Sequence, residues 1–99
     1  MIYVDELRPV RAPWLGRFAC HLVSDDSIEE LLSFAGSIGL PQHWCREHSL
    51  TPHFDLSPAW RARALHAGAR VVTARDLARI TIEAKQSGRL QVAPHPFMR

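Results

Sequence analysis

The amino-acid sequence predicts one small α/β domain, in which three main helices pack on a sheet of three or four strands. Three segments carry apolar residues at helical spacing, and each begins at a capping residue and ends at a glycine. Short apolar runs lie before and between these segments and have the length of buried strands. A chain of 99 residues can bury one core of its own, so this alternation favours a single α/β unit.

The N-terminal part is expected to supply two strands joined by a loop. Residues 2–4 are short and apolar and end at Asp5, so they predict a buried strand. Residues 6–16 contain two prolines and end in a glycine, a composition typical of a loop. Residues 17–23 predict the second strand, whose alternating side chains place His21 on the face opposite its two neighbours.

A capping box marks the start of the first helix. Ser27 and Glu30 have the spacing at which the serine hydroxyl caps the helix N-terminus. Apolar residues recur at helical spacing beyond them, and Gly39 then supplies a left-handed stop. Residues 42–47 predict one or two further helical turns that present Trp44.

The second half begins with an extended segment over residues 50–56, in which Pro52 cannot donate to a central ladder. Ser57 and Pro58 are a strong helix start, because a capping hydroxyl is followed by proline at the first helical position. That helix is expected to end at a glycine, just before a short strand over residues 69–72. The strand-helix-strand order predicts a right-handed parallel crossover.

The last helix is expected to begin at Thr73, whose hydroxyl can cap it, and to end at Gly88. We therefore expect one α/β domain over residues 1–88. Residues 89–99 contain two prolines and a few apolar side chains, and predict a partly ordered C-terminal tail.

Charge and cysteine content narrow the class of protein. Twelve basic residues against ten acidic ones give a net charge of only +2, without a dense basic run, so nucleic-acid binding is not favoured. No apolar stretch approaches the roughly 18 residues that a membrane helix needs, and no signal peptide is recognisable. Cys20 and Cys45 are expected to be free thiols in a reducing cytoplasm.

Histidine and aspartate side chains in the strand-like segments form the candidate site. His53 and Asp55 are two residues apart in an extended segment, so they share a face. Together with His21 they are the candidate catalytic residues, and these three with Asp5 are the candidate metal ligands. Imidazole and carboxylate groups suit zinc, manganese or iron(II), so a divalent metal is the cofactor to consider. The alternative is a set of hydrogen-bonded histidines without a metal.

Arginine and tryptophan residues could complete a substrate-binding wall. Arg17, Arg61 and Trp14 are the candidate substrate-binding residues, and Arg8 and Arg11 could add further positive charge. Arginine binds phosphate through two parallel hydrogen bonds, and a tryptophan ring can stack on a base or sugar. The alternative is that the arginines are solvated surface residues and that the tryptophan covers the rim of the core.

An ordered series of short motifs resembles a known family, the small bacterial and phage proteins grouped as domain of unknown function 4031. The resemblance extends over roughly residues 2–73. It is carried by Tyr3-Val4-Asp5, Trp14, Cys20-His21-Leu22, Ile38-Gly39-Leu40, Trp44, His53-Phe54-Asp55, Arg61 and Gly68-Ala69. The family pattern suggests tyrosine between the histidine and the aspartate, whereas this chain has phenylalanine and so lacks a phenolic acid there. The resemblance implies no particular activity.

Three functions therefore remain open. The first is an accessory module that binds a small anionic ligand or a protein partner through a polar cleft of His, Asp and Arg side chains. The second is a small, metal-dependent or metal-independent hydrolase or nuclease-like enzyme acting on a phosphate-bearing substrate, for which imidazole groups have a suitable pKa. The third is weak nucleic-acid binding through the arginines. The oligomeric state stays open.

Overall fold

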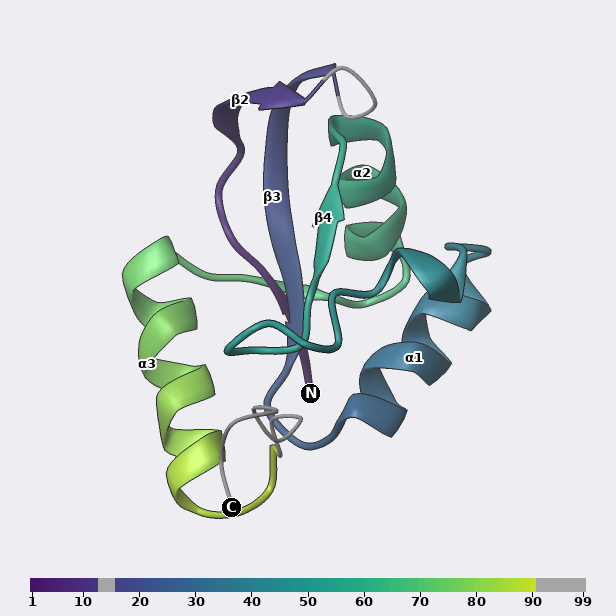
Figure 1. Ribbon diagram of the computed structural model, residues 1–99. Helices are drawn as coiled ribbons and strands as arrows, with labels where there is room; N and C mark the ends of the chain where they lie inside the picture. Colours follow the sequence, from purple (N-terminus) through teal and green to yellow (C-terminus); the bar gives the residue numbers. More distant parts are fainter. Residues whose placement is uncertain (13–15, 91–99) are drawn as a thin grey trace.

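Strands and helices alternate along the chain in the computed structural model, which describes residues 1–12 and 16–90 (Figure 1). In order, the elements are β1 (Ile2–Val4), β2 (Arg8–Ala12), β3 (Gly16–Ser24), α1 (Ile28–Ser37), the 3-10 helix η1 (Gln42–Trp44), β4 (Phe54–Leu56), α2 (Pro58–His66), β5 (Arg70–Val71) and α3 (Ala74–Gln86). The predicted α/β class is confirmed, although the mixed sheet has five strands rather than three or four.

The long strand β3 organises the sheet. It pairs antiparallel with β2 along its first half and with both β1 and β4 along its second half. β5 extends the sheet beyond β1, to which it runs parallel. β3 therefore has neighbours on both edges around Leu22, which lies opposite Val4 of β1 and opposite Phe54 of β4.

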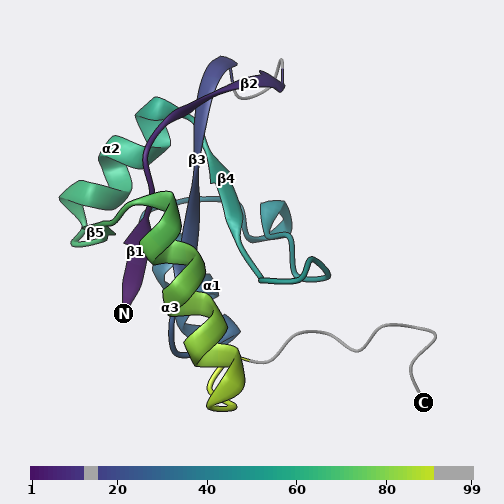
Figure 2. The same cartoon turned by 90° about the vertical axis from the view of Figure 1, so that its left-hand side faces the viewer.

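Helices cover both faces of this sheet, which separates two buried regions. Figure 1 shows α1 and α2 on one side of the strands and α3 on the other, and Figure 2 shows α3 in front of the sheet. The larger core lies on the α1 and α2 side, and its fully buried side chains include Val4, Leu22, Leu31, Ala35, Phe54, Leu56 and Ala64. Val23 lies on the opposite face and is also buried, as are Leu77 and Ala84 of α3.

One strand lies where the sequence predicted a loop. Residues 8–12 form β2, which pairs with the beginning of β3 through Arg8 opposite Ala19 and Pro9 opposite Phe18. Pro9 is tolerated because β2 is an edge strand, and the register shifts between Pro9 and Ala12. The prolines therefore mark an irregular edge strand rather than the absence of pairing, and this strand is the fifth of the sheet.

The extended segment predicted over residues 50–56 is a strand only from Phe54. Before it, the Ser49 hydroxyl donates to the Thr51 carbonyl at 2.5 Å and also contacts the Arg46 carbonyl at 3.0 Å. These local bonds compete with the sheet ladder and hold the chain in a turn. The backbone returns to pairing at His53, whose carbonyl accepts a hydrogen bond from the Arg46 N–H at 2.8 Å.

The predicted parallel crossover is present, but it joins strands that are not neighbours in the sheet. β4 and β5 run in the same direction, with β3 and β1 between them. The two short strands occupy opposite sides of the β3–β1 pair, because β4 pairs with β3 and β5 pairs with β1. The helix α2 thus bridges the centre of the sheet instead of linking neighbouring strands.

All three helix starts use the predicted caps. The side chains of Ser27, Ser57 and Thr73 accept hydrogen bonds from backbone N–H groups three residues later. Each helix is followed by a glycine with positive φ, namely Gly39, Gly68 and Gly88, where a side chain would be strained. For residues 89–90 of the expected tail, Leu90 is buried, whereas residues 91–99 lie outside the described part of the chain.

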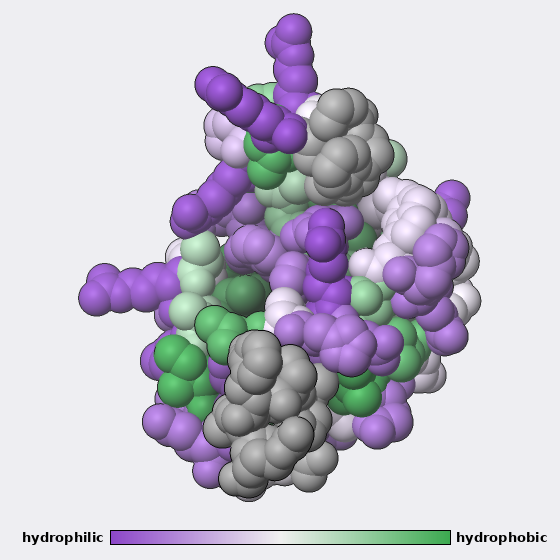
Figure 3. Space-filling view, in the orientation of Figure 1, coloured by the Kyte–Doolittle hydropathy of each residue, from purple (hydrophilic) through white to green (hydrophobic). Residues whose placement is uncertain are grey.

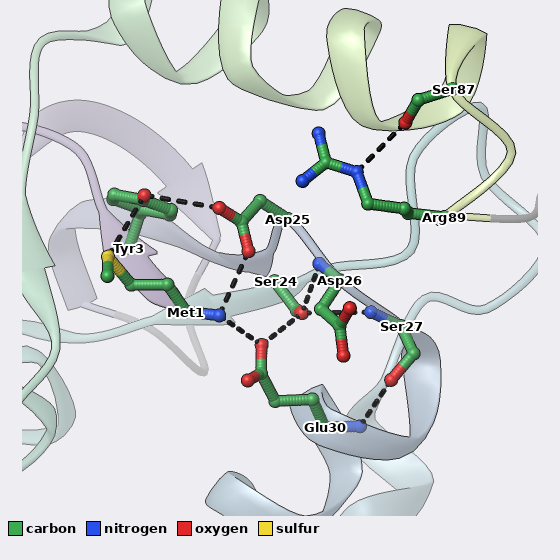
Figure 4. A network of polar contacts seen from close by, with 9 residues as sticks. All are labelled: Met1, Tyr3, Ser24, Asp25, Asp26, Ser27, Glu30, Ser87 and Arg89. Carbon is green, nitrogen blue, oxygen red and sulfur yellow. Dashed lines mark hydrogen bonds and ion pairs between the residues drawn. The ribbon is translucent and has the colours of Figure 1, made fainter.

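The end of β3 is tied to the start of α1 by a buried serine (Figure 4). The Ser24 hydroxyl donates to a Glu30 carboxylate oxygen at 2.5 Å and accepts hydrogen bonds from the backbone N–H groups of Asp26 and Ser27. The same Glu30 oxygen also accepts from the amino group of Met1 at 2.6 Å. The glutamate of the predicted capping box therefore bonds to Ser24 and Met1, and the Ser27 N–H finds its partner in Ser24.

Replacing Ser24 by alanine tests this connection. The Ser24→Ala variant leaves two backbone N–H groups without their acceptor, which should cost about 2 kcal/mol of unfolding free energy. At about 4–8 °C per kcal/mol for a domain of this size, the melting temperature should fall by about 8–16 °C. Differential scanning calorimetry measures the change. Ser33→Ala, an exposed position on α1, is the control and should leave the melting temperature nearly unchanged; equal melting temperatures for the two variants would contradict the role of Ser24.

Candidate functional site

A row of polar side chains crosses one face of the sheet. His21 of β3 lies directly opposite Asp55 of β4. On the other edge Val4 lies opposite Leu22, so the next residue, Asp5, comes beside His21, and the Asp5 N–H donates to the His21 carbonyl at 3.4 Å. Directly paired residues project to the same face of a sheet. The three polar side chains therefore lie on the face opposite the larger core.

Asp5 holds the His21 ring in one orientation. One carboxylate oxygen lies 2.9 Å from Nδ1 of His21, and the other accepts the His21 backbone N–H at 2.7 Å. The Asp5 side chain is 2 % exposed, whereas His21 is 49 % exposed. Because the carboxylate accepts the Nδ1 proton, Nε2 of neutral His21 carries the free lone pair.

Charge coupling shifts the pKa of both partners. The hydrogen bond to Asp5 raises the pKa of His21 above its ordinary value, against the opposing effect of burial. Burial favours a raised pKa for Asp5, but the hydrogen bonds from the His21 side chain and backbone outweigh it, so the pKa of Asp5 is lowered. Asp5 is therefore ionised at neutral pH and increases the basicity of His21.

His53 is oriented in the same way by the turn that precedes β4. Its Nδ1 lies 2.8 Å from the Thr51 carbonyl oxygen and 3.1 Å from the Ser49 hydroxyl. A carbonyl can only accept, so Nδ1 of His53 carries the proton and Nε2 is left free. Lys85 of α3 holds this turn from outside, because its amino group donates to the Leu50 carbonyl at 3.3 Å and to the Thr51 hydroxyl at 3.0 Å.

The two free imidazole nitrogens meet at Asp55. Nε2 of His53 lies 3.5 Å from Oδ1 of Asp55, and Nε2 of His21 lies 3.9 Å from the same oxygen. One ligating atom from each of the three residues lies within 4.8 Å of the others, and the imidazole rings are edge to face with centroids 5.4 Å apart. When His53 is protonated, its Nε2–H faces Asp55, and this hydrogen bond is the largest cause of a lowered pKa of Asp55.

This arrangement has the chemistry of a metal site. Two imidazole nitrogens and one carboxylate converge, and the second nitrogen of each ring is fixed by a carboxylate or a backbone carbonyl. Such outer partners are usual for metal-binding histidines, because they fix the tautomer and raise the basicity of the ligand. Zinc, manganese and iron(II) accept this donor set. Asp5 holds Nδ1 of His21, so its place in the geometry is that of an orienting residue.

Two cavities adjoin the site. The first, which we call the basic cavity, has a volume of about 430 Å³, and its lining residues include Asp5, Arg8, Arg11, His21, Arg46 and Asp55. The second, which we call the tryptophan cavity, has about 470 Å³ and is lined by His43, Trp44, Cys45, Arg46, Asp55, Ser57 and Trp60. Arg46 and Asp55 line both, and their side chains approach to 3.6 Å. Figure 3 shows hydrophilic side chains gathered over the middle of β3 and β4.

The predicted substrate-binding residues differ in where they lie relative to the site. Arg61, on α2, donates through Nε to the Asp5 carbonyl at 3.1 Å, so it holds the backbone beside His21. Arg17 is exposed near the start of β3 and lines neither of the two cavities just described. Trp14 lies outside the described residues. Arg8 and Arg11, which the sequence offered as further positive charge, line the basic cavity.

The sequence did not single out Arg46 or the residues that orient His53. Arg46 reaches Asp55 only because its backbone pairs with His53 across the turn. Nothing in the spacing of residues 46–55 reveals this closure in advance. The sequence predicted an extended segment over residues 50–56, so the turn that brings these side chains together was missed.

The two cysteines are free, as expected. Cys20 is buried in the larger core, and burial raises the pKa of its thiol to about 12. Burial raises the pKa of Cys45 to about 11. Both groups are therefore protonated and unreactive at neutral pH.

Replacing Asp5 by asparagine tests the orientation of His21. In metal-free protein, Asp5→Asn should lower the pKa of His21 toward its ordinary value, because the imidazolium loses its buried counter-charge. The ion pair stabilises the fold where both groups are charged, so the loss of stability should be greatest near about pH 5.5 and shrink as the pH rises through the folded pKa of His21.

Histidine titration by NMR measures the pKa directly. Glu83→Gln, at an exposed position on α3, is the control and should leave the titration of His21 unchanged. An unchanged His21 titration in Asp5→Asn would show that the contact does not couple the two groups.

Comparison with known proteins identifies the family to which the chain belongs. No curated protein and no solved structure matches the chain. Among the described residues, no helix has the length and apolar character to cross a membrane. The family described as protein of unknown function (DUF4031) matches residues 2–84, a span that includes every residue of the candidate metal site. The chain therefore belongs to the DUF4031 family.

Proposed function

We propose that this protein is a small metal-dependent hydrolase that acts on a phosphate-bearing substrate. The observation that supports it is the convergence of Nε2 of His21, Nε2 of His53 and the Asp55 carboxylate. In both rings Nδ1 is hydrogen-bonded to an acceptor, which fixes the orientation of the ring. Three protein ligands leave further positions of a divalent metal open to water, which is the arrangement that catalytic metal sites require.

Arginine side chains beside the candidate ligands support an anionic substrate. Arg8, Arg11 and Arg46 line the basic cavity together with three carboxylates, Asp5, Glu6 and Asp55. Asp5 is paired with His21, and Asp55 is a candidate metal ligand. Guanidinium groups bind phosphate through paired hydrogen bonds and neutralise charge that develops on its oxygens. In the proposed reaction the oxygen of a water bonds to phosphorus, the bond to the leaving oxygen breaks, and a proton from the water ends on that oxygen. A divalent metal held by His21, His53 and Asp55 would lower the pKa of the attacking water.

A second candidate function is a binding module without catalysis. It is favoured by the contacts that Asp55 already makes with His21, His53 and Arg46, since a charge-balanced cluster of this kind can exist without a metal. The same arginines would then hold a small anionic ligand or an acidic group of a protein partner. The free thiols support a reducing cytoplasm as the compartment for either function.

Metal binding is the first test. We expect one zinc, manganese or iron(II) ion per chain in isothermal titration calorimetry, with iron handled without oxygen. His53→Ala should remove this binding, and Asp5→Ala should weaken it by about 10–100-fold, as expected when an orienting partner is lost. His66→Ala, at the exposed end of α2, is the matched control and should bind like the parent protein. A parent protein that binds none of the three ions would refute the proposal.

Hydrolysis is the second test. With the bound metal, the protein should release p-nitrophenol from bis(p-nitrophenyl) phosphate or p-nitrophenyl phosphate, or cleave a short single-stranded oligonucleotide. Arg46→Ala should reduce the rate, whereas Arg75→Ala, an exposed position on α3, should not. Metal binding without turnover of any of these substrates would favour the binding module. Binding of the oligonucleotide that weakens linearly with log salt, without metal dependence, would favour nucleic-acid binding through the arginines.

A further inference from the structure

The tryptophan cavity is not used by the proposed chemistry, yet it adjoins the same carboxylate. Its volume of about 470 Å³ is typical of a small-molecule site. It shares Arg46 and Asp55 with the basic cavity, so the two spaces meet at the side chains beside the candidate metal ligands. A ligand that occupied both cavities would therefore pass over the Arg46 and Asp55 side chains.

The aromatic residues in this cavity are fixed but still accessible. Trp44 and Trp60 contact edge to face, with ring centroids 6.2 Å apart, so their faces are not stacked on each other. The Arg63 guanidinium lies over the Trp60 ring at 4.8 Å from its centroid, which holds that ring from one side. Trp44 is 46 % exposed, an unusual exposure for a ring of this size beside a cavity. Exposed, pre-positioned rings of this kind bind planar groups.

We propose that the tryptophan cavity binds the heteroaromatic base of a nucleotide whose phosphate lies at Arg46 in the basic cavity. This inference rests on the proposed function and names its substrate class. A nucleotide has both required groups, a planar base for the tryptophans and an anion for the arginines, joined by one sugar.

The polar lining favours a base over an apolar side chain of a protein partner. The Ser57 hydroxyl, the His43 ring and the Asp55 carboxylate all line the same cavity as the tryptophans. A heteroaromatic base carries donors and acceptors that can pair with such groups, whereas an aliphatic or phenyl group can pair with none of them. The adjacent arginine charge is also matched by a phosphate.

Binding of defined probes tests the inference. The four ribonucleoside monophosphates, together with ribose 5-phosphate as the probe without a base, are titrated into metal-loaded and metal-free protein by calorimetry. At least one nucleotide should bind at least about tenfold more tightly than ribose 5-phosphate, because stacking of a base on an aromatic ring contributes that much. In NMR spectra the indole N–H signal of Trp44 should shift with the nucleotide and not with ribose 5-phosphate.

Substitution of Trp44 tests whether the base binds against the ring of this residue. Trp44→Leu should weaken nucleotide binding by about tenfold or more and leave ribose 5-phosphate binding unchanged. Trp44→Phe retains a ring and should have an intermediate affinity, which keeps the test decisive if the leucine variant folds poorly. Ile82→Ala is the matched control, since Ile82 is an apolar residue of similar exposure, 48 %, on α3.

The outcomes separate this inference from the proposed function. Metal binding with equal affinity for nucleotide and ribose 5-phosphate, insensitive to Trp44, would overturn the base-binding cavity and leave the metal site standing. Trp44-dependent nucleotide binding by a protein that binds no metal would support the cavity and refute the hydrolase. Failure of all four nucleotides, with binding of an aromatic peptide instead, would overturn the inference in favour of a protein partner.

Discussion

The register of β3 is the constraint on which the fold and the candidate site both depend. Side chains alternate along a strand, so Cys20 and Leu22 enter the larger core while His21 between them faces the opposite side. A shift of one residue would exchange these faces, burying an imidazole and exposing two apolar side chains. Burial of the core on one face therefore fixes the position of the polar row on the other.

The buried carboxylate of Asp5 would destabilise the domain without its partners. An ionised group removed from water needs hydrogen bonds that offset the lost hydration, and His21 supplies two of them. Arg61 adds a bond to the Asp5 carbonyl from α2, on the other side of the sheet. Asp5, which orients His21, is thus held by the ring and the backbone N–H of His21 and by the side chain of Arg61 on α2. Such support is what keeps a ligand-binding geometry rigid.

Local rules of sequence predicted a large part of this structure. The helix caps, the glycine stops and the opposite faces of Cys20 and His21 depend on spacings of a few residues, and all are present as predicted. The convergence of His53 and Asp55 follows from a spacing of two in an extended segment. The strand β2 and the contact of Arg46 with Asp55 depend instead on pairing between segments that are close in the sequence, Ala12 with Gly16 and Arg46 with His53. The composition of these segments did not predict that they would pair. Pro9 favoured a loop in the sequence, but an edge strand tolerates a proline that a central strand would not.

The three candidate ligands lie in backbone segments that differ in local stability. His21 and Asp55 lie in strands that pair at the centre of the domain, so their backbone amides should exchange with solvent only when much of the fold opens. His53 lies at the end of a turn held by side-chain bonds of Ser49 and Lys85, and such segments open at lower free energy. One ligand can therefore leave the cluster by local unfolding while the other two stay in place. The off-rate of a bound ion would then reflect the opening of this turn rather than the stability of the domain.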